Sequence, residues 1–208
     1  MRLIRQFDSM TLPRALPAVI LALLIISCAR PPLPPPPDPA FAALGLKHII
    51  IGPVAYATYQ PNEMCSVFID EELRSAVGRE VRSIGYPATA VGNSVPRSFA
   101  AGTPAPTVGA AIPVDPAFSQ PGEGVLLTWI DEYWENTLCG WEGPKYLTMG
   151  AVAILYAGSP PREVWRGQAR VAEQGDYAAR DLIWLTTSRL SDQLLVTLPA
   201  GPGYVAPR

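Results

Sequence analysis

The chain has 208 residues, 49% hydrophobic and 16% charged, which is the composition of a folded domain with extensions and excludes a wholly disordered protein. Its formal net charge is −2 and no basic run follows the amino-terminal stretch, so the electrostatic signature of nucleic-acid binding is missing and we expect no nucleic-acid partner. The 24 prolines cluster at 31–39, 96–121 and 199–207, which predicts irregular backbone in those three segments.

The amino-terminal segment is typical of a signal peptide. Three arginines precede the apolar run 15–27, which is shorter than the ~20 residues that a membrane-spanning helix needs. We therefore expect residues 1–27 to be cleaved off, with either Met1 or Met10 as the start of translation. An uncleaved membrane helix is the alternative.

The apolar run ends in Ile25-Ile-Ser-Cys28, which resembles the lipobox of bacterial lipoproteins. The resemblance implies that the thiol of Cys28 receives a diacylglycerol and that the cleaved chain carries a further acyl chain such as palmitate. Two or three acyl chains, at ~0.8 kcal/mol per buried methylene, hold a protein on a bilayer durably. Ala29 follows the cysteine, as in lipoproteins sorted to the outer membrane, which implies a chain anchored there and facing the periplasm.

A proline-rich tether is predicted directly after the anchor, over residues 28–44. Prolines fix φ and lack an amide donor, so this segment favours polyproline II over a helix or a strand. We expect a stiff stalk that holds the folded domain clear of the lipid headgroups. A proline-rich ligand for another protein is the alternative.

Two cysteines besides Cys28 remain in the chain, Cys65 and Cys139. In an oxidising envelope compartment they could form a disulfide that closes a long loop. The alternative is that both cysteines are buried as free thiols at separate places, because unpaired cysteine is among the most buried residue types.

The sequence of the first half of the domain predicts four segments in chain order. They are a strand over residues 46–53 that Gly52-Pro53 ends, a helix over 65–84, a further strand over 86–92 and a long connection over 93–123. Acidic residues lie early in the helix and Gly85 is its expected C′ residue. Its apolar stripe consists of Ile69, Leu73, Ala76, Val77, Val81 and Ile84.

The sequence of the second half predicts a meander of three strands, over residues 124–136, 146–157 and 163–172. A helix over residues 176–196 follows, with Asp176 as its cap. The order β-α-β-loop-β-β-β-α predicts a single α+β domain over residues 45–198, with a mostly antiparallel sheet and two main helices on one face. Residues 199–208 are expected to be a flexible tail.

This layout, behind a lipobox, resembles the envelope lipoproteins whose domain is similar to the amino-terminal domain of TolB and to the curli-secretion lipoprotein. The resemblance is carried by four stretches, 49–54, 83–86, 124–128 and 163–169, with sequences IIIGPV, SIGY, GVLLT and EVWRGQA. It implies a protein-interaction or assembly module without a cofactor or catalytic residues. The partners it implies are envelope proteins, with a homo-oligomer as a further prospect.

The best candidate for chemistry is the stretch Trp129-Ile-Asp-Glu-Tyr-Trp-Glu135. Strict strand alternation would place Trp129, Asp131, Tyr133 and Glu135 on one face and Glu132 on the other. At ~3.3 Å per residue the carboxylates of Asp131 and Glu135 would be ~13 Å apart, beyond the ~5–9.5 Å of a glycosidase pair. We therefore expect no catalysis here, and the four residues are a candidate ligand surface on which a sugar could stack.

Other site patterns are missing from the sequence. His48 is the only histidine and lies among aliphatic residues, no cysteine or histidine pair has the short spacing of a zinc site, and there is no phosphate-binding loop. We therefore expect a non-enzymatic, lipid-anchored scaffold or accessory factor with no metal or cofactor. The alternative is a lipid-anchored protein that binds a glycan or another small ligand.

Overall fold

The computed structural model describes residues 39–57, 63–91, 104–108, 120–136, 138–140 and 143–206. The chain divides into two units, Met1–Leu33 and Pro34–Arg208, and every element described below belongs to the second. The predicted signal peptide 1–27, the predicted lipidation site Cys28 and most of the predicted tether lie outside the described residues. None of the helices in the described ranges is long and apolar enough to span a membrane.

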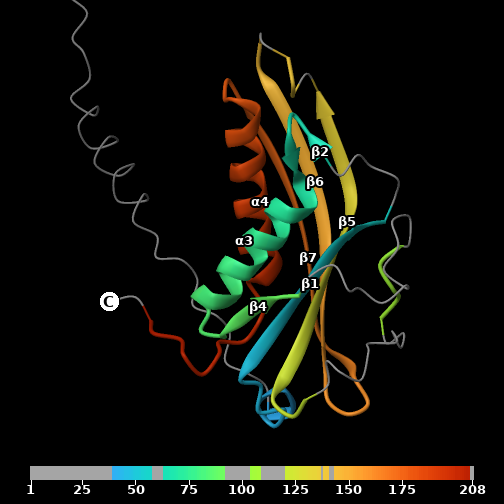
Figure 1. The fold of residues 1–208 in the computed structure, drawn as a ribbon, viewed down its shortest axis with the longest axis vertical. Coiled ribbons are helices and arrows are strands. Elements are labelled where there is room, and N and C mark those ends of the chain that lie inside the picture. Colours follow the sequence, from blue (N-terminus) through green and yellow to red (C-terminus); the bar gives the residue numbers. More distant parts are fainter. Residues whose placement is uncertain are drawn as a thin grey trace, which may run out of the picture. The chain divides into compact units, whose positions relative to one another are not determined.

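A five-stranded sheet forms the centre of the second unit, with the strand order β4-β1-β5-β6-β7 (Figure 1). Its strands are β1 His48–Tyr56, β4 Ala88–Ala90, β5 Glu123–Asn136, β6 Lys145–Ala157 and β7 Arg162–Gly175. Strand β1 pairs in parallel with β4 and β5, whereas β5–β6 and β6–β7 are antiparallel. The α+β class is confirmed. The sheet is mixed, and its antiparallel ladders are the longer ones.

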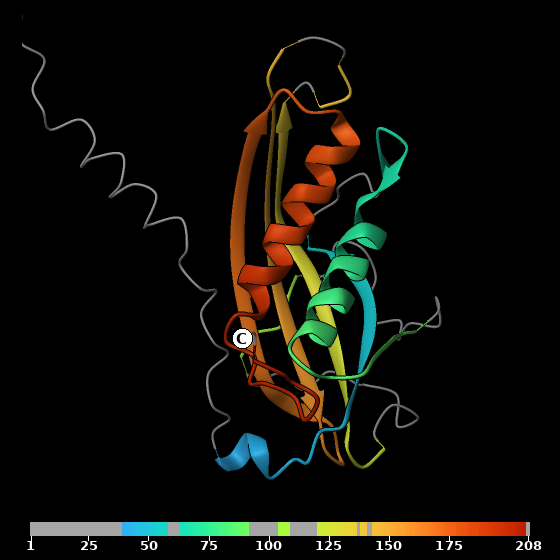
Figure 2. The same ribbon diagram turned by 90° about the vertical axis from the view of Figure 1, so that its left-hand side faces the viewer.

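Two helices cover one face of this sheet (Figure 2), as predicted. They are α3 Ile69–Ser83 and α4 Ala179–Leu195. The predicted stripe of α3 is buried along its whole length, from Ile69 to Ile84. Burial of such a stripe removes apolar surface from water and is what holds an amphipathic helix against a sheet.

The sheet has an apolar cluster on each face. The inner cluster lies beneath the helices and includes Leu73, Leu126, Ile130, Leu155 and Leu190. The outer cluster lies on the opposite face, has Val91 and Ala105 packed against it, and consists of Ile50, Ala55, Val125, Leu127, Trp129, Val152, Ile154 and Tyr156. Arg166 donates a hydrogen bond to the carbonyl of Pro106, which also holds this covering segment. Strand β5 is therefore buried on both faces over its first half.

Strand β1 does not end at Gly52-Pro53, as the sequence suggests, but continues to Tyr56. Its register with β5 shifts between Ile51 and Val54, so the proline without an amide hydrogen lies at an irregularity of the ladder. A side chain at Gly52 would collide with the side chain of Leu127, which explains the glycine.

The helix predicted from residue 65 begins four residues later because residues 63–68 form a small hairpin. Its strands are β2 Glu63–Met64 and β3 Val67–Phe68. Cys65 and Ser66 both have positive φ, 51° and 65°, as the two central residues of a type I′ turn require. The structure joins Cys65 and Cys139 in a disulfide with the Cα atoms 5.3 Å apart.

Both ends of the domain differ from the prediction. A short helix, α2 Pro39–Ala42, carries Phe41 into the inner cluster with only 7% exposure, so the folded part begins at residue 39 rather than 45. Helix α4 begins at Ala179, with Ala178 and not Asp176 at the cap position.

The segment after α4 is not a free tail. The amides of Gly201 and Gly203 donate hydrogen bonds to the carbonyls of Ile84 and Gly85, 2.7 and 3.0 Å away. A side chain at Gly201 would lie 2.6 Å from the backbone of Gly85, so this close approach of two backbones needs glycine. The expectation of a flexible tail over 199–208 is therefore wrong for its described part.

We predict that the double variant Cys65→Ser/Cys139→Ser lowers the free energy of unfolding by about 4 kcal/mol, since the bridge closes a loop with a sequence separation of 74. Urea unfolding of the oxidised protein and of the variant measures this difference. A thiol assay on the unfolded, non-reduced protein that finds both thiols free would contradict the pairing.

Candidate functional site on the open face of the sheet

A β-bulge in the middle of β5 places the polar side chains of this strand. The register with β6 shifts between Ile130, opposite Ala151, and Glu132, opposite Gly150, so Asp131 is the extra residue. A bulge inverts the alternation beyond it. Consequently Asp131 and Glu132 both lie on the outer face, where the sequence placed Glu132 on the face opposite to Asp131.

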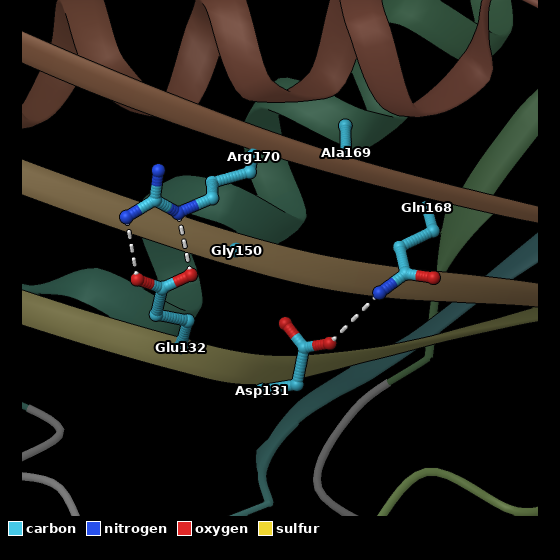
Figure 3. A pocket seen from close by; sticks show the side chains of 6 residues that line it. All are labelled: Asp131, Glu132, Gly150, Gln168, Ala169 and Arg170. Carbon is cyan, nitrogen blue, oxygen red and sulfur yellow. Dashed lines mark hydrogen bonds and ion pairs between the residues drawn. The ribbon is translucent and has the colours of Figure 1, made fainter.

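Each of these two carboxylates meets a polar side chain from β7 (Figure 3). Arg170 donates two hydrogen bonds to Glu132, of 2.6 and 2.8 Å, in the bidentate geometry of the strongest charge-assisted pairs. Gln168 donates a 3.3 Å hydrogen bond to Asp131. Gly150 lies between them, and a Cβ there would be 2.9 Å from a carboxylate oxygen of Asp131, so its missing side chain leaves the hollow that these residues line.

The two neighbouring carboxyl groups differ in proton affinity. The hydrogen bonds from Arg170 hold the pKa of Glu132 below its ordinary value. Partial burial, together with the nearby charge of Glu132, raises the pKa of Asp131. The hollow thus contains one carboxylate neutralised by a guanidinium and one whose ionised form is less favoured.

An exposed tryptophan lies one row further along the same face. Beyond the bulge, Trp134 faces outward opposite Thr148, and its side chain is 55% exposed. Thr148 pairs in turn with Ala172 of β7, so the surface beside the indole is built from small side chains. We call the group of Asp131, Glu132, Trp134, Gly150, Gln168 and Arg170 the open patch.

The four residues predicted as one ligand surface are not together. Trp129 is 1% exposed in the outer cluster, and Tyr133 is turned inward against the inner cluster. Burial and then the nearby charge of Glu135 raise the pKa of the Tyr133 hydroxyl. Glu135 accepts a hydrogen bond from the amide of Leu138, a structural role in the loop that carries the disulfide. Of the four, only Asp131 belongs to the open patch.

Sequence reasoning missed the bulge and therefore Trp134, Gly150 and Arg170. One signal was available. Two adjacent acidic residues in an alternating strand point to opposite faces, so either both faces of the strand are exposed there or a bulge turns the two residues to the same face. Gly150 within strand β6 was a second signal, since glycine within a strand often marks a bulge or a close approach.

The chemistry open to this patch is recognition by hydrogen bonds, charge and stacking. Arg170 and Gln168 are donors, Asp131 is an acceptor, and the exposed indole is a stacking surface. His48 lies elsewhere, beside Glu123 at 3.4 Å and Thr89 at 3.1 Å near the start of β1. Among the described residues no group of three histidine, cysteine or acidic side chains is arranged to hold a metal ion.

Comparison with known proteins gives fold neighbours only. No protein-family model matches the chain, and no curated protein matches it. The PelC dodecamer from Paraburkholderia phytofirmans is 17% identical, with a TM-score of 0.46, over 80% of this chain and 95% of that one. The lipoprotein GNA1162 from Neisseria meningitidis is 15% identical, with a TM-score of 0.42, over 71% and 96%. Both TM-scores are below 0.5, and neither likeness assigns a function to this chain.

We predict that Arg170→Met raises the pKa of Glu132 toward its ordinary value, because the variant removes both charge-assisted hydrogen bonds. Because the pKa of Glu132 is lower in the folded state than in the unfolded state, the ion pair stabilises the fold at pH values above the unfolded-state pKa. This stabilisation is lost as the pH falls through the folded-state pKa. Carboxyl ¹³C titration by NMR measures the change, with Arg180→Met as a control on an exposed arginine of α4. An unchanged Glu132 titration in Arg170→Met would show that the pair does not form in solution.

Proposed function

We propose that this chain is a bacterial lipoprotein, anchored through acyl chains on Cys28 to the outer membrane, where its folded domain faces the periplasm as a non-enzymatic scaffold or accessory factor. The observation that carries the proposal is the order of its parts. An apolar run ending in Ile-Ile-Ser-Cys is followed by prolines and then, from residue 39, by the folded domain. The prolines predict a short, stiff segment between the anchor and the domain.

The disulfide between Cys65 and Cys139 supports an envelope location, because such bonds persist in oxidising compartments. The polar groups of the open patch support binding over catalysis. Its most basic group, Arg170, is occupied by Glu132, and the described residues near Asp131 include neither a histidine nor a thiol that could share a proton with it.

Strand β7 supports a protein partner, either another envelope protein or further copies of this chain. It forms one edge of the sheet and spans 14 residues, Arg162–Gly175, that contain neither proline nor lysine. Five charged side chains and a register shift opposite Leu155 and Tyr156 protect this edge in part, but its length leaves a long row of backbone groups with which a partner's strand can pair.

A second candidate function is binding of a glycan or another small polar ligand by the open patch. The specific observation in its favour is the exposed Trp134, which lies one row from Arg170 and two rows from Gln168 on the same face. An aromatic plane beside polar groups suits a sugar ring, which has an apolar face and hydroxyl edges.

We predict that Cys28→Ala abolishes anchoring through acyl chains, because the variant lacks the sulfur that takes the diacylglycerol. The variant should keep the signal segment, lack the mass of the acyl chains, and differ from the wild type in detergent partitioning. Mass spectrometry and partitioning measure both effects, with Cys65→Ser/Cys139→Ser as a control that retains Cys28. Equal mass, apart from the substitution, and equal partitioning for wild type and Cys28→Ala would overturn the lipoprotein proposal.

We predict that Asp131→Asn and Glu132→Gln leave cellular function nearly intact, because the scaffold proposal gives neither carboxylate a chemical step. The measurement is the envelope integrity of cells that carry only the variant, together with its crosslinked partners at the membrane. Loss of function by one carboxylate substitution, at unchanged thermal midpoint and anchoring, would favour a specific site in the open patch.

We predict for the second candidate that Trp134→Ala weakens glycan binding at least tenfold, by loss of a stacking contact of ~1.5 kcal/mol or more. Affinity electrophoresis through gels containing soluble polysaccharides measures binding. Trp184→Ala is the matched control, since Trp184 is 54% exposed on α4, away from the open patch. Equal retardation of wild type and Trp134→Ala in every gel would remove this candidate.

A further inference from the structure

A second pocket lies at the end of the sheet where α4 begins. It has a volume of about 360 Å³, and its walls include both disulfide cysteines, Lys145 at the start of β6, and residues 176–179. The disulfide ties the turn of the β2–β3 hairpin to the loop after β5 and so fixes one wall of the pocket. None of these residues belongs to the open patch.

Helix α4 begins at this pocket, which Ala178 and Ala179 line, and the amides of its first turn are unused hydrogen-bond donors. The helix is 17 residues long, and its cap residue is Ala178, which makes no side-chain cap hydrogen bond. The first intrahelical bond at this end runs from the amide of Leu182 to the carbonyl of Ala178. The amides of residues 179–181 therefore have neither an intrahelical acceptor nor a capping side chain, and the helix dipole makes this end positive.

A buried lysine lines the same pocket and is an independent observation. Lys145 is 7% exposed, and its position in β6, two residues before the buried Leu147, places it on the helix side of the sheet. Within the described ranges its ammonium group has no ion pair or hydrogen bond. The ammonium nitrogen is not fully enclosed, so it reaches the open space of the pocket, where an anion can pair with it.

Two acidic residues limit what that anion can be. Asp176 lines the pocket from an exposed position, and Asp181 lies in the first turn of α4. Arg180, also exposed, adds one positive charge at the same helix end. The two acidic side chains would repel the further charges of an extended polyanion, so the site favours one compact oxyanion close to Lys145.

We propose that this pocket binds a small oxyanion, a phosphate or carboxylate group, with Lys145 as its counter-charge and the amides of residues 179–181 as its hydrogen-bond donors. Helix N-termini bind such groups through the same donors. The two chemical sources of the group differ in shape and charge, and inorganic phosphate and glucuronate represent them. The site is independent of the proposed anchor and of the open patch.

The chain contains only two lysines, Lys47 and Lys145, so full chain labelled with ¹³Cε-lysine gives one signal for each in detergent solution. We expect inorganic phosphate, glucuronate or both to shift the Lys145 signal saturably at constant ionic strength, while that of exposed Lys47 does not move. A larger shift of the Lys145 signal with phosphate would identify the natural ligand group as a tetrahedral dianion. A larger shift with glucuronate would identify it as a carboxylate. No saturable shift with either probe would overturn the proposal.

Two variants separate binding from folding. Lys145→Met retains the apolar stem, and Ala178→Asp supplies both a helix cap and a negative charge, so it should keep or raise the thermal midpoint. We expect each variant to weaken binding of the effective probe at least tenfold, measured by calorimetry, while Lys47→Met binds as wild type. Wild-type affinity in Lys145→Met, or in Ala178→Asp, would overturn the assigned site.

Discussion

The bulge at Asp131 is the constraint on which the rest of the outer face depends. Strand β5 pairs with β1 on one side and β6 on the other, and its first half is buried between the inner and outer clusters. The extra residue inverts the alternation beyond Ile130. The same strand therefore continues from a doubly buried segment into one that directs polar side chains outward. Without this shift, Trp134 would point at the helices and Tyr133 at solvent.

The two faces of the sheet consequently have different roles. Helices α3 and α4 cover the inner face, and their long apolar contact supplies the stability of the domain. Among the residues that the structure describes, the cover on the outer face lies near the outer cluster, and the open patch and the edge strand β7 lie beyond it. The pocket beside Lys145 lies at the end of the sheet where the disulfide connects two loops.

The order and type of the main elements could be predicted from the sequence, because α3 and β5 to β7 carry clear periodicity and turn residues. Three features could not. The hairpin at Cys65 depends on left-handed backbone at two residues without glycine, the packing of Gly201 against Gly85 joins distant segments, and the bulge depends on pairing with β6. Each is decided by tertiary contacts that local pattern does not encode. The candidate site was misplaced for this reason, since a one-residue shift exchanges the faces of every side chain beyond it.

Accessibility of single introduced cysteines tests the bulge most directly. Trp134→Cys and Tyr133→Cys, each in the chain with Cys65 and Cys139 kept as a disulfide, are treated with a maleimide under native conditions. The account predicts rapid labelling at position 134 and protection at position 133, because the first faces outward and the second packs on the inner cluster. Rapid labelling at 133 with protection at 134 would mean that β5 alternates strictly, and it would contradict the open patch.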